Sequence, residues 1–263
     1  MTTSSTQPQS AAATVLSGPP KVIAFATQKG GMGKTTLSVL VASWLHYKRG
    51  INVAILDVDG AQLSVYNQRI RESQQIEQDE DLSTRLEEQD VAPYPILSGN
   101  PGDVPNLLAE LPEDVQLVFV DMPGNIDVAG YETAIKSVDY LIVPMETSEY
   151  SVTTGISYLN AIQEIDLLPV SQCRIIWNKY KPSRDAELAD ILEERFKGIG
   201  LLCMQSRVPQ RDSYQDSANR STLFPMPGNY LRNSGLKDLF PEIEQLVSLT
   251  AKPKTDGDST DTE

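Results

Sequence analysis

A glycine- and lysine-rich segment at residues 29–36, Lys-Gly-Gly-Met-Gly-Lys-Thr-Thr, constrains the fold of this 263-residue chain more than any other feature. It directly follows an apolar run at 22–26, and the apolar residues of 37–45 then recur at helical spacing until Gly50. A buried strand, a glycine-rich turn and a helix in this order are the context that a phosphate-binding loop requires. The segment therefore predicts a phosphate site between the first strand and the first helix.

Four more short apolar runs follow, at residues 53–56, 117–120, 140–143 and 174–177. The segments between them are long enough to form helices. Because the runs are continuously apolar and do not alternate, we expect both faces of these strands to be covered, which is typical of a parallel sheet. The expected fold class is α/β: a three-layer P-loop NTPase fold with a mostly parallel sheet and helices on both faces.

Three polar segments flank or interrupt this alternation. Residues 1–20 are rich in Ser, Thr, Ala, Gln and Pro, and residues 252–263 end in acidic residues, so both are expected to be disordered tails. One domain is then expected over 21–251. The acidic stretch 60–92 interrupts it, and we expect this insertion to be partly helical, near 61–70 and 82–88, with its helices solvated on the surface.

The composition limits the function further. The chain has 22 Lys and Arg residues against 36 Asp and Glu, and its formal net charge of −14 repels polyanions such as DNA. The two cysteines, Cys173 and Cys203, form no C-x-x-C pair, so neither a disulfide framework nor a zinc site is indicated. No segment reads as a signal peptide or a membrane span, so we expect a cytoplasmic protein without membrane contact.

The loop residues supply the chemistry that a nucleotide and its metal require. Those expected to surround the nucleotide phosphates are Gly30, Gly31, Met32, Gly33, Lys34, Thr35 and Thr36. Glycines let backbone N–H groups approach the phosphates, and the helix N-terminus adds partial positive charge. Lys34 would contact the β- and γ-phosphates, the Thr35 hydroxyl would bind Mg²⁺, and Thr36 would reach the α-phosphate. ATP and Mg²⁺ are the expected cofactors.

The loop departs from the strict phosphate-loop pattern, because Gln28 stands where that pattern has glycine and a second lysine, Lys29, begins the loop. In both respects it resembles the deviant Walker A loop of the ParA/MinD ATPases, K-G-G-x-G-K-T-T. The resemblance covers roughly 21–248 and implies a ParA-like ATPase domain that forms a homodimer with ATP. Lys29 would cross to the partner's nucleotide, so Lys29 and Lys34 are both expected to act in catalysis.

Three aspartates at predicted strand ends extend the resemblance. Asp57-Val58-Asp59 resembles the A′ motif of the family, in which Asp59 would orient the attacking water and Asp57 would support the magnesium region. Asp121, which directly follows the run 117–120 and precedes Met-Pro-Gly, resembles the Walker B aspartate that holds Mg²⁺ through a water. Carboxylates at the carboxyl ends of parallel strands face the crevice where α/β proteins bind ligands. Thr35, Asp57 and Asp121 are therefore the expected metal residues.

The resemblance also implies contacts to the base and to partners. Asn178 would hydrogen-bond the adenine, and Pro209 and Arg211 would close over it. The implied partners are an adaptor similar to ParB and, in some relatives, nonspecific DNA. The basic residues that could contact DNA are Arg174, Lys179, Lys181, Arg184, Arg207, Arg211, Arg220, Arg232 and Lys237. The acidity of the whole chain counts against DNA.

Partitioning or positioning of DNA or another cargo is the function that the resemblance implies. A nucleotide-switched regulator of conjugative transfer without DNA contact stays open, since 28–47, 121–124 and 220–225 resemble ParA-type proteins of Bacteroidetes conjugative elements. A MinD-like membrane protein is disfavoured by the acidic C-terminus. A relative of the nitrogenase iron protein is disfavoured because no cysteine lies near 121–127.

The remaining conspicuous side chains are expected to be structural. His46 is the only histidine, which excludes a histidine triad or a multi-histidine metal site. We expect it to pack or cap. Trp44 and Trp177 flank apolar segments and are expected to anchor the core.

Overall fold

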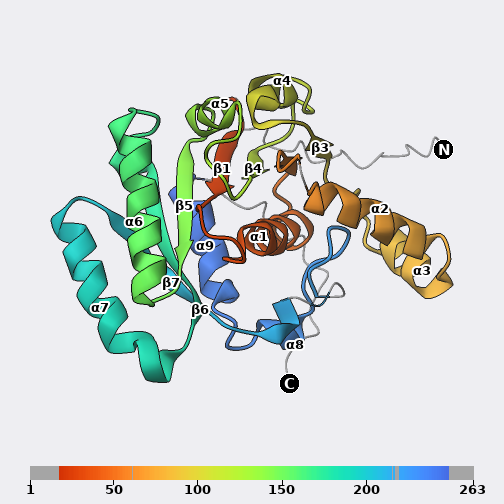
Figure 1. Cartoon of the computed structure of the whole chain (residues 1–263). Coiled ribbons are helices and arrows are strands. Elements are labelled where there is room, and N and C mark those ends of the chain that lie inside the picture. The colour runs from red at the N-terminus through yellow and green to blue at the C-terminus, as the bar shows by residue number, and fades with distance from the viewer. Residues whose placement is uncertain (1–17, 61, 215, 217–218, 249–263) are drawn as a thin grey trace, which may run out of the picture.

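The computed structural model describes residues 18–60, 62–214, 216 and 219–248. The two expected tails lie outside the described residues, apart from 18–20. Over the described part, strands and helices alternate as the sequence predicts (Figure 1).

The sheet has seven strands, all parallel, in the order β3-β2-β4-β1-β5-β6-β7. Their bounds are β1 (Lys21–Phe25), β2 (Val53–Asp57), β3 (Ile96–Ser98), β4 (Leu117–Asp121), β5 (Tyr140–Met145), β6 (Cys173–Tyr180) and β7 (Leu202–Pro209). The five predicted runs correspond to β1, β2, β4, β5 and β6. The sequence missed both edge strands, because β3 is a half-buried three-residue strand and β7 alternates buried with more exposed residues instead of forming an apolar run.

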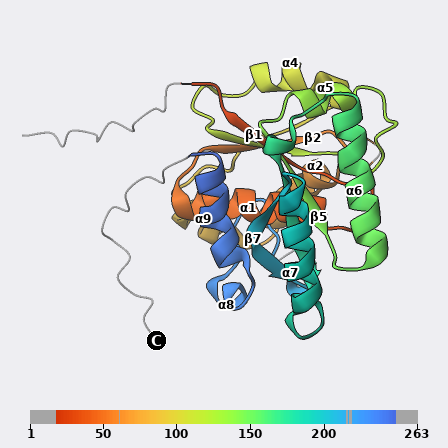
Figure 2. The ribbon, with the colours of Figure 1, turned by 90° about the vertical axis from the view of Figure 1, so that its left-hand side faces the viewer.

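Helices cover both faces of the sheet, which confirms the three-layer α/β fold (Figures 1 and 2). Their bounds are α1 (Lys34–Arg49), α2 (Ser64–Ile76), α3 (Glu80–Glu88), α4 (Val104–Ala109), α5 (Tyr131–Lys136), α6 (Glu149–Glu164), α7 (Pro182–Gly198), α8 (Gly228–Leu231) and α9 (Leu236–Leu246), with 3-10 turns at Pro101–Asp103, Val170–Gln172 and Asp212–Tyr214. Helices α4 to α7 pack on one face, and α1, α2 and α9 pack on the other. In β1, Val22 and Ala24 enter the first core while Ile23 and Phe25 enter the second.

Helix α1 begins and ends at glycines. Gly33 precedes it at φ 81° and Gly50 follows it at φ 65°, where an L side chain would be strained. The Gly50 N–H donates to the His46 carbonyl at 3.2 Å. The His46 ring is buried, and its Nδ1 and Nε2 lie 3.1 Å and 2.8 Å from the carbonyl oxygens of Ile51 and Ala92. This placement confirms the packing role expected for the histidine.

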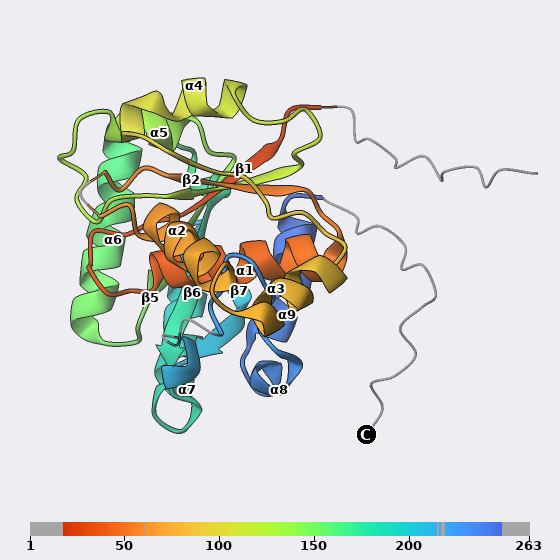
Figure 3. The same ribbon diagram turned by 90° about the vertical axis from the view of Figure 1, so that its right-hand side faces the viewer.

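The acidic insertion forms two helices: α2 lies beside α1, and α3 packs against α2 (Figures 1 and 3). Helix α3 has no buried residue, as expected of a solvated helix. Helix α2 differs, because Val65 and Gln68 are buried against the body of the protein. The expectation of a solvated surface helix is therefore correct for α3 and wrong for α2. Helix α2 is partly buried because its polar side chains contact the segment 220–222, and the periodicity of the sequence does not reveal such contacts.

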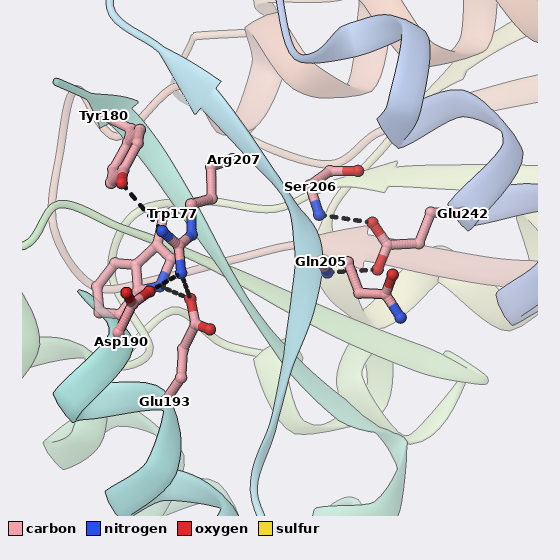
Figure 4. Close-up of polar contacts among 8 residues, drawn as sticks. All are labelled: Trp177, Tyr180, Asp190, Glu193, Gln205, Ser206, Arg207 and Glu242. Atoms are coloured by element: carbon pink, nitrogen blue, oxygen red, sulfur yellow. Dashed lines mark hydrogen bonds and ion pairs between the residues drawn. The ribbon is translucent and has the colours of Figure 1, made fainter. Parts of the chain in front are cut away.

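Side chains of neighbouring helices form polar contacts with the edge strand β7 (Figure 4). The Glu242 carboxylate of α9 accepts the N–H groups of Gln205 and Ser206 at 2.6 and 2.9 Å. An edge strand with free N–H groups invites pairing with another chain, so this contact protects the edge. Across the strand, the Glu193 carboxylate accepts from the indole N–H of fully buried Trp177 at 2.7 Å, which confirms Trp177 as a core anchor.

No helix in the described ranges has the length and apolar character that crossing a membrane demands.

Candidate functional site

The loops after β1, β2 and β4 surround one cleft at the carboxyl edge of the sheet. The residues lining it are Gly30, Gly31, Met32, Gly33, Lys34, Thr35, Thr36, Asp59, Gln62, Ser64, Gly124 and Arg220. Strand β1 is flanked by β4 and β5, so the loop that follows it lies near the middle of this edge. The structure thus brings together the seven predicted loop residues and Asp59.

Asp121 ends β4 and faces the first turn of α1. The Thr35 hydroxyl donates to its carboxylate, at 2.8 Å to Oδ2 and 3.1 Å to Oδ1. The pKa of Asp121 is raised to about 7, mainly by burial and also by the nearby Asp57 carboxyl, while the Thr35 hydrogen bond opposes the rise. A bound cation would therefore stabilise the ionised form of this buried carboxylate.

These residues fit Mg²⁺. Hydroxyl and carboxylate oxygens are the donors that it prefers, and in nucleotide sites it usually takes one or two protein ligands together with phosphate oxygens and waters. Among the described residues, no group of three or more His, Cys, Asp or Glu could hold a metal without such additional ligands. Thr35 and Asp121 would therefore hold Mg²⁺ together with the nucleotide.

Asp57 ends β2 and turns away from the cleft toward α2. Its Oδ2 accepts the N–H groups of Val65 and Tyr66 at 2.8 and 3.0 Å, so the side chain caps the helix N-terminus. Its Oδ1 is buried without a hydrogen-bond partner. Burial raises the pKa of Asp57, and these backbone bonds oppose the rise. Its predicted support of the metal stays a prediction, and the cap is a role that the sequence did not indicate.

Lys34 begins α1, with its ammonium directed toward the loop after β4. A Cβ at Gly124 would lie 3.5 Å from Lys34 Nζ, so that glycine leaves space beside the ammonium. Burial lowers the pKa of Lys34, and the carboxylates of Asp121 and Asp59 oppose this. In the described part of the chain, no carboxylate lies within 4 Å of the ammonium. A half-buried cation without an ion pair at the start of a helix suits a phosphate ligand.

The loop backbone adopts conformations that glycine favours. Gly31 and Gly33 have φ values of 71° and 81°, in the left-handed region. A Cβ at Gly33 would also lie 2.6 Å from the Asn178 amide nitrogen. The first turn of α1 leaves its N–H groups without helical partners, which suits a phosphate cradle.

A second hollow adjoins the loop on the side of β6 and β7. It is lined by Gly31, Gly33, Thr36, Leu37, Asn178, Lys179, Pro209, Gln210, Arg211 and Tyr214. The structure therefore gathers the three residues expected at the base, Asn178, Pro209 and Arg211, around one space next to the phosphate loop. Tyr214 was missed because a lone tyrosine in a polar segment gives no sequence signal.

Asn178 and Arg211 also form hydrogen bonds within the protein. The Asn178 amide donates to the Met32 carbonyl at 2.7 Å, which leaves its side-chain oxygen for a base. The Arg211 guanidinium donates to the carbonyls of Tyr230, Arg232 and Asn233 at 2.6–3.2 Å. Asn178 does not end the strand as expected, since β6 continues to Tyr180 with register irregularities that can redirect side chains.

Lys29 lies at the outer rim of the loop. Its ammonium is 3.7 Å from Glu146 Oε2 and lies over the ring of Tyr150, 5.4 Å from the ring centre. Tyr150 is 70% exposed, so this corner faces solvent. Both contacts are weak enough at the surface for the lysine to exchange them for a phosphate.

Several of the bases expected to contact DNA have internal partners. Arg184 pairs with Asp185 at 2.6 Å, and Lys179 pairs with Glu146 at 3.5 Å. Arg207 pairs with Asp190 and Glu193 (Figure 4). Arg220, which the sequence analysis placed among these bases and not at the nucleotide, lines the phosphate cleft. No motif predicted this placement, because 184 residues separate Arg220 from its contact, Thr36.

Comparison with known proteins agrees with this geometry. Residues 23–224 match the family described as the CobQ/CobB/MinD/ParA nucleotide binding domain. No curated protein sequence matches the chain.

Solved structures share the fold. A protein described as a plasmid partition protein from Borrelia burgdorferi B31, bound to AMPPNP, is 16% identical with a TM-score of 0.59 over 87% of this chain and 98% of its own. A ParA family ATPase from Chlorobium tepidum TLS is 20% identical, with a TM-score of 0.57 over 87% and 99%. The MinD cell division protein of Aquifex aeolicus is 17% identical, with a TM-score of 0.57 over 89% and 100%. At these identities the likeness establishes the fold alone.

Proposed function

Because the chain belongs to the CobQ/CobB/MinD/ParA nucleotide-binding family, we propose that it is a Mg²⁺-dependent ATPase that forms a homodimer around ATP. The observation that carries the proposal is the convergence of Lys34, Thr35 and Asp59 on one cleft, with Asp121 hydrogen-bonded to Thr35. A structural relative with the same fold binds AMPPNP, an ATP analogue, which supports ATP as the ligand.

Each residue has a task in this proposal. Lys34 and the loop N–H groups hold the phosphates, and Asn178, Pro209 and Arg211 surround the base. Thr35 and Asp121 hold Mg²⁺, which supplies positive charge to the phosphates when bound. Asp59 orients the attacking water and accepts its proton.

Lys29 leaves Glu146 and Tyr150 and contacts the phosphates held by the partner subunit, where added positive charge offsets repulsion between two nucleotides.

The function of this ATP-dependent dimer is to partition or position DNA or another cargo, together with an adaptor similar to ParB. Two of the structural relatives are described as a partition protein and a ParA ATPase, which supports this class of function. Nonspecific DNA binding by the ATP dimer would use basic residues that have no internal carboxylate partner among the described residues. Lys181, Arg232 and Lys237 are such residues.

A second candidate is a nucleotide-switched regulator that does not bind DNA. The ion pairs of Lys179, Arg184 and Arg207 favour it, because they neutralise three of the bases expected to meet phosphates. The net charge of −14 favours it as well.

Nucleotide binding and assembly test the proposal directly. The purified protein should bind ATP and ADP in calorimetry, hydrolyse ATP only with Mg²⁺, and become dimeric with ATP in light scattering. Lys34→Ala should weaken ATP binding roughly 10- to 100-fold, as expected for a lost charge-assisted contact, whereas Lys48→Ala, an exposed residue at the far end of α1, should not. A wild-type protein that binds neither nucleotide would refute the assignment.

DNA binding separates the two candidates. A random-sequence duplex that binds only with ATP, and more weakly as salt increases, supports partitioning through DNA. No binding at low salt, with ATP dimerisation intact, supports the second candidate.

A further inference from the structure

The buried face of α2 is fastened to the segment 220–222 by polar contacts. The Arg69 guanidinium donates to the hydroxyl and the carbonyl of Thr222 at 2.8 and 2.9 Å. The Glu72 carboxylate accepts the Thr222 N–H at 2.9 Å and its hydroxyl at 2.5 Å. The Gln68 amide donates to the Arg220 carbonyl. Two adjacent turns of α2 therefore hold this short segment.

Helix α1 also holds the same segment. The Ser43 hydroxyl donates to the Ser221 carbonyl at 2.7 Å, and the Tyr47 hydroxyl donates to the Thr222 carbonyl at 2.8 Å. Thr222 is fully buried, at 0% exposure. With its backbone held by both helices, the segment can direct the side chain of Arg220 to one place.

That place is the phosphate cleft. The Arg220 Nη1 lies 3.1 Å from the Thr36 hydroxyl, and the side chain lines the cleft together with Lys34 and Gly124. Its Nε is buried and has no hydrogen-bond partner. Over the described ranges, no carboxylate lies within 4 Å of the guanidinium. A half-buried guanidinium without an ion pair is costly unless an anion meets it.

We propose that Arg220 is a phosphate-binding residue, supplied by the same subunit that holds the nucleotide and positioned by α2. The proposal rests on the proposed function and adds a cation that the loop motif does not contain. A guanidinium can donate two parallel hydrogen bonds to phosphate oxygens, which a lysine cannot. Since Arg220 approaches from the Thr36 side, its contact is to the α-phosphate end of the chain, which ATP and ADP share.

Equilibrium binding tests this, with titration calorimetry of ATP and ADP on the full-length protein. Arg220→Gln should weaken both nucleotides about 10- to 100-fold, the loss typical of a charge-assisted contact. Arg220→Lys should lose less, because it keeps the charge without the paired donors. The matched control is Arg71→Gln, which removes an exposed charge close enough to influence Arg220 without lining the cleft.

The outcomes are distinct. A wild-type protein that binds ATP while Arg220→Gln binds it equally well overturns the role of Arg220 and leaves the proposed function standing. A loss confined to ATP overturns the placement at the shared α-phosphate end. If wild type binds no nucleotide, the proposed function itself fails.

Thermal melting without nucleotide controls for folding. Because the guanidinium is half-buried without an ion pair, Arg220→Gln should not lower the melting temperature, but nucleotide should raise it less than in wild type. Gln68→Met provides a second variant, since it removes the hydrogen bond to the Arg220 carbonyl but keeps the arginine side chain. It should weaken ADP binding at least threefold but less than Arg220→Gln does. Wild-type affinity in this variant overturns the positioning role of α2.

Discussion

The hydroxyl of Thr35 lies 2.8 Å from Oδ2 of Asp121, although 86 residues separate the two in the chain. Thr35 belongs to the first turn of α1 and Asp121 is the last residue of β4, so the contact joins the phosphate loop to the neighbouring strand. Asp121 is 1% exposed and its pKa is raised to about 7. The fold therefore holds a carboxyl that is poorly accommodated as an anion until a cation arrives.

This burial makes the free energy of unfolding depend on pH. The carboxyl has a pKa of 3.8 when exposed and about 7 in the fold, so the folded state binds the proton more tightly. Its contribution to stability is present at low pH and is lost as pH rises from about 4 to 7. Asp121→Asn lacks this loss. In metal- and nucleotide-free protein, the gain in unfolding free energy over wild type should be about 2–3 kcal/mol larger at pH 8 than at pH 5.

Urea denaturation at the two pH values measures this difference, and a gain independent of pH would contradict the prediction. The same variant should bind ATP with no benefit from Mg²⁺. In wild type, the benefit from Mg²⁺ should increase as pH rises through about 7, because the metal requires the ionised carboxylate.

Gly33→Ala should damage the loop while Gly30→Ala should not. Gly33 has φ 81°, and an added Cβ would lie 2.6 Å from the Asn178 amide nitrogen. At Gly30 an added Cβ would meet no heavy atom within 4 Å, and the backbone is not in the left-handed region. We expect Gly33→Ala to cost about 1–3 kcal/mol in stability and at least tenfold in ADP affinity. ADP titrations with paired thermal melts compare the two, and equal effects would contradict the loop geometry.

Lys29→Ala should impair assembly more than nucleotide binding. Among the residues that the structure describes, the ammonium contacts only Glu146 and Tyr150, at the rim of the loop. Removing it should leave ADP affinity within about threefold of wild type, prevent ATP-dependent dimers and lower hydrolysis about 100-fold or more. Light scattering and phosphate release measure these effects, with Lys48→Ala as the control. A monomer that no longer binds ATP would mean that Lys29 is an ordinary ligand of its own nucleotide.

Most of the fold could be predicted from the sequence because its inner strands are continuous apolar runs. β1, β2, β4, β5 and β6 are largely buried, so each contains a short apolar run. The edge strands β3 and β7 are covered less fully and lack that signal. The phosphate loop was predictable for a different reason. Its residues are contiguous in the chain, and their chemistry requires glycines and a lysine in a fixed order.

The remainder of the site depends on contacts between distant segments. Arg220 reaches Thr36 only because α2 and α1 hold 220–222, and those contacts involve polar side chains without any periodicity. The sequence predicts a metal role for Asp57 beside Asp59 but does not indicate the cap that its carboxylate provides for α2. Pattern alone could not tell which of two neighbouring aspartates faces the cleft, because that depends on where the next helix begins.

Asp57 and Asp59 should therefore give opposite results when each is replaced by alanine. Asp57→Ala removes the acceptor of the Val65 and Tyr66 N–H groups and should lower the free energy of unfolding by about 1–2 kcal/mol. Asp59 lines the phosphate cleft, so Asp59→Ala should keep ATP binding and dimerisation but lower hydrolysis about 10²- to 10⁴-fold.

Without hydrolysis the ATP dimer should accumulate, and gel filtration with light scattering after incubation with ATP should show it persisting. Glu113→Ala provides the control, since this exposed carboxylate lies in the loop before β4, far from the cleft. Hydrolysis at the wild-type rate in Asp59→Ala would mean that another residue orients the attacking water. Loss of stability in Asp59→Ala, with normal stability in Asp57→Ala, would exchange the two roles.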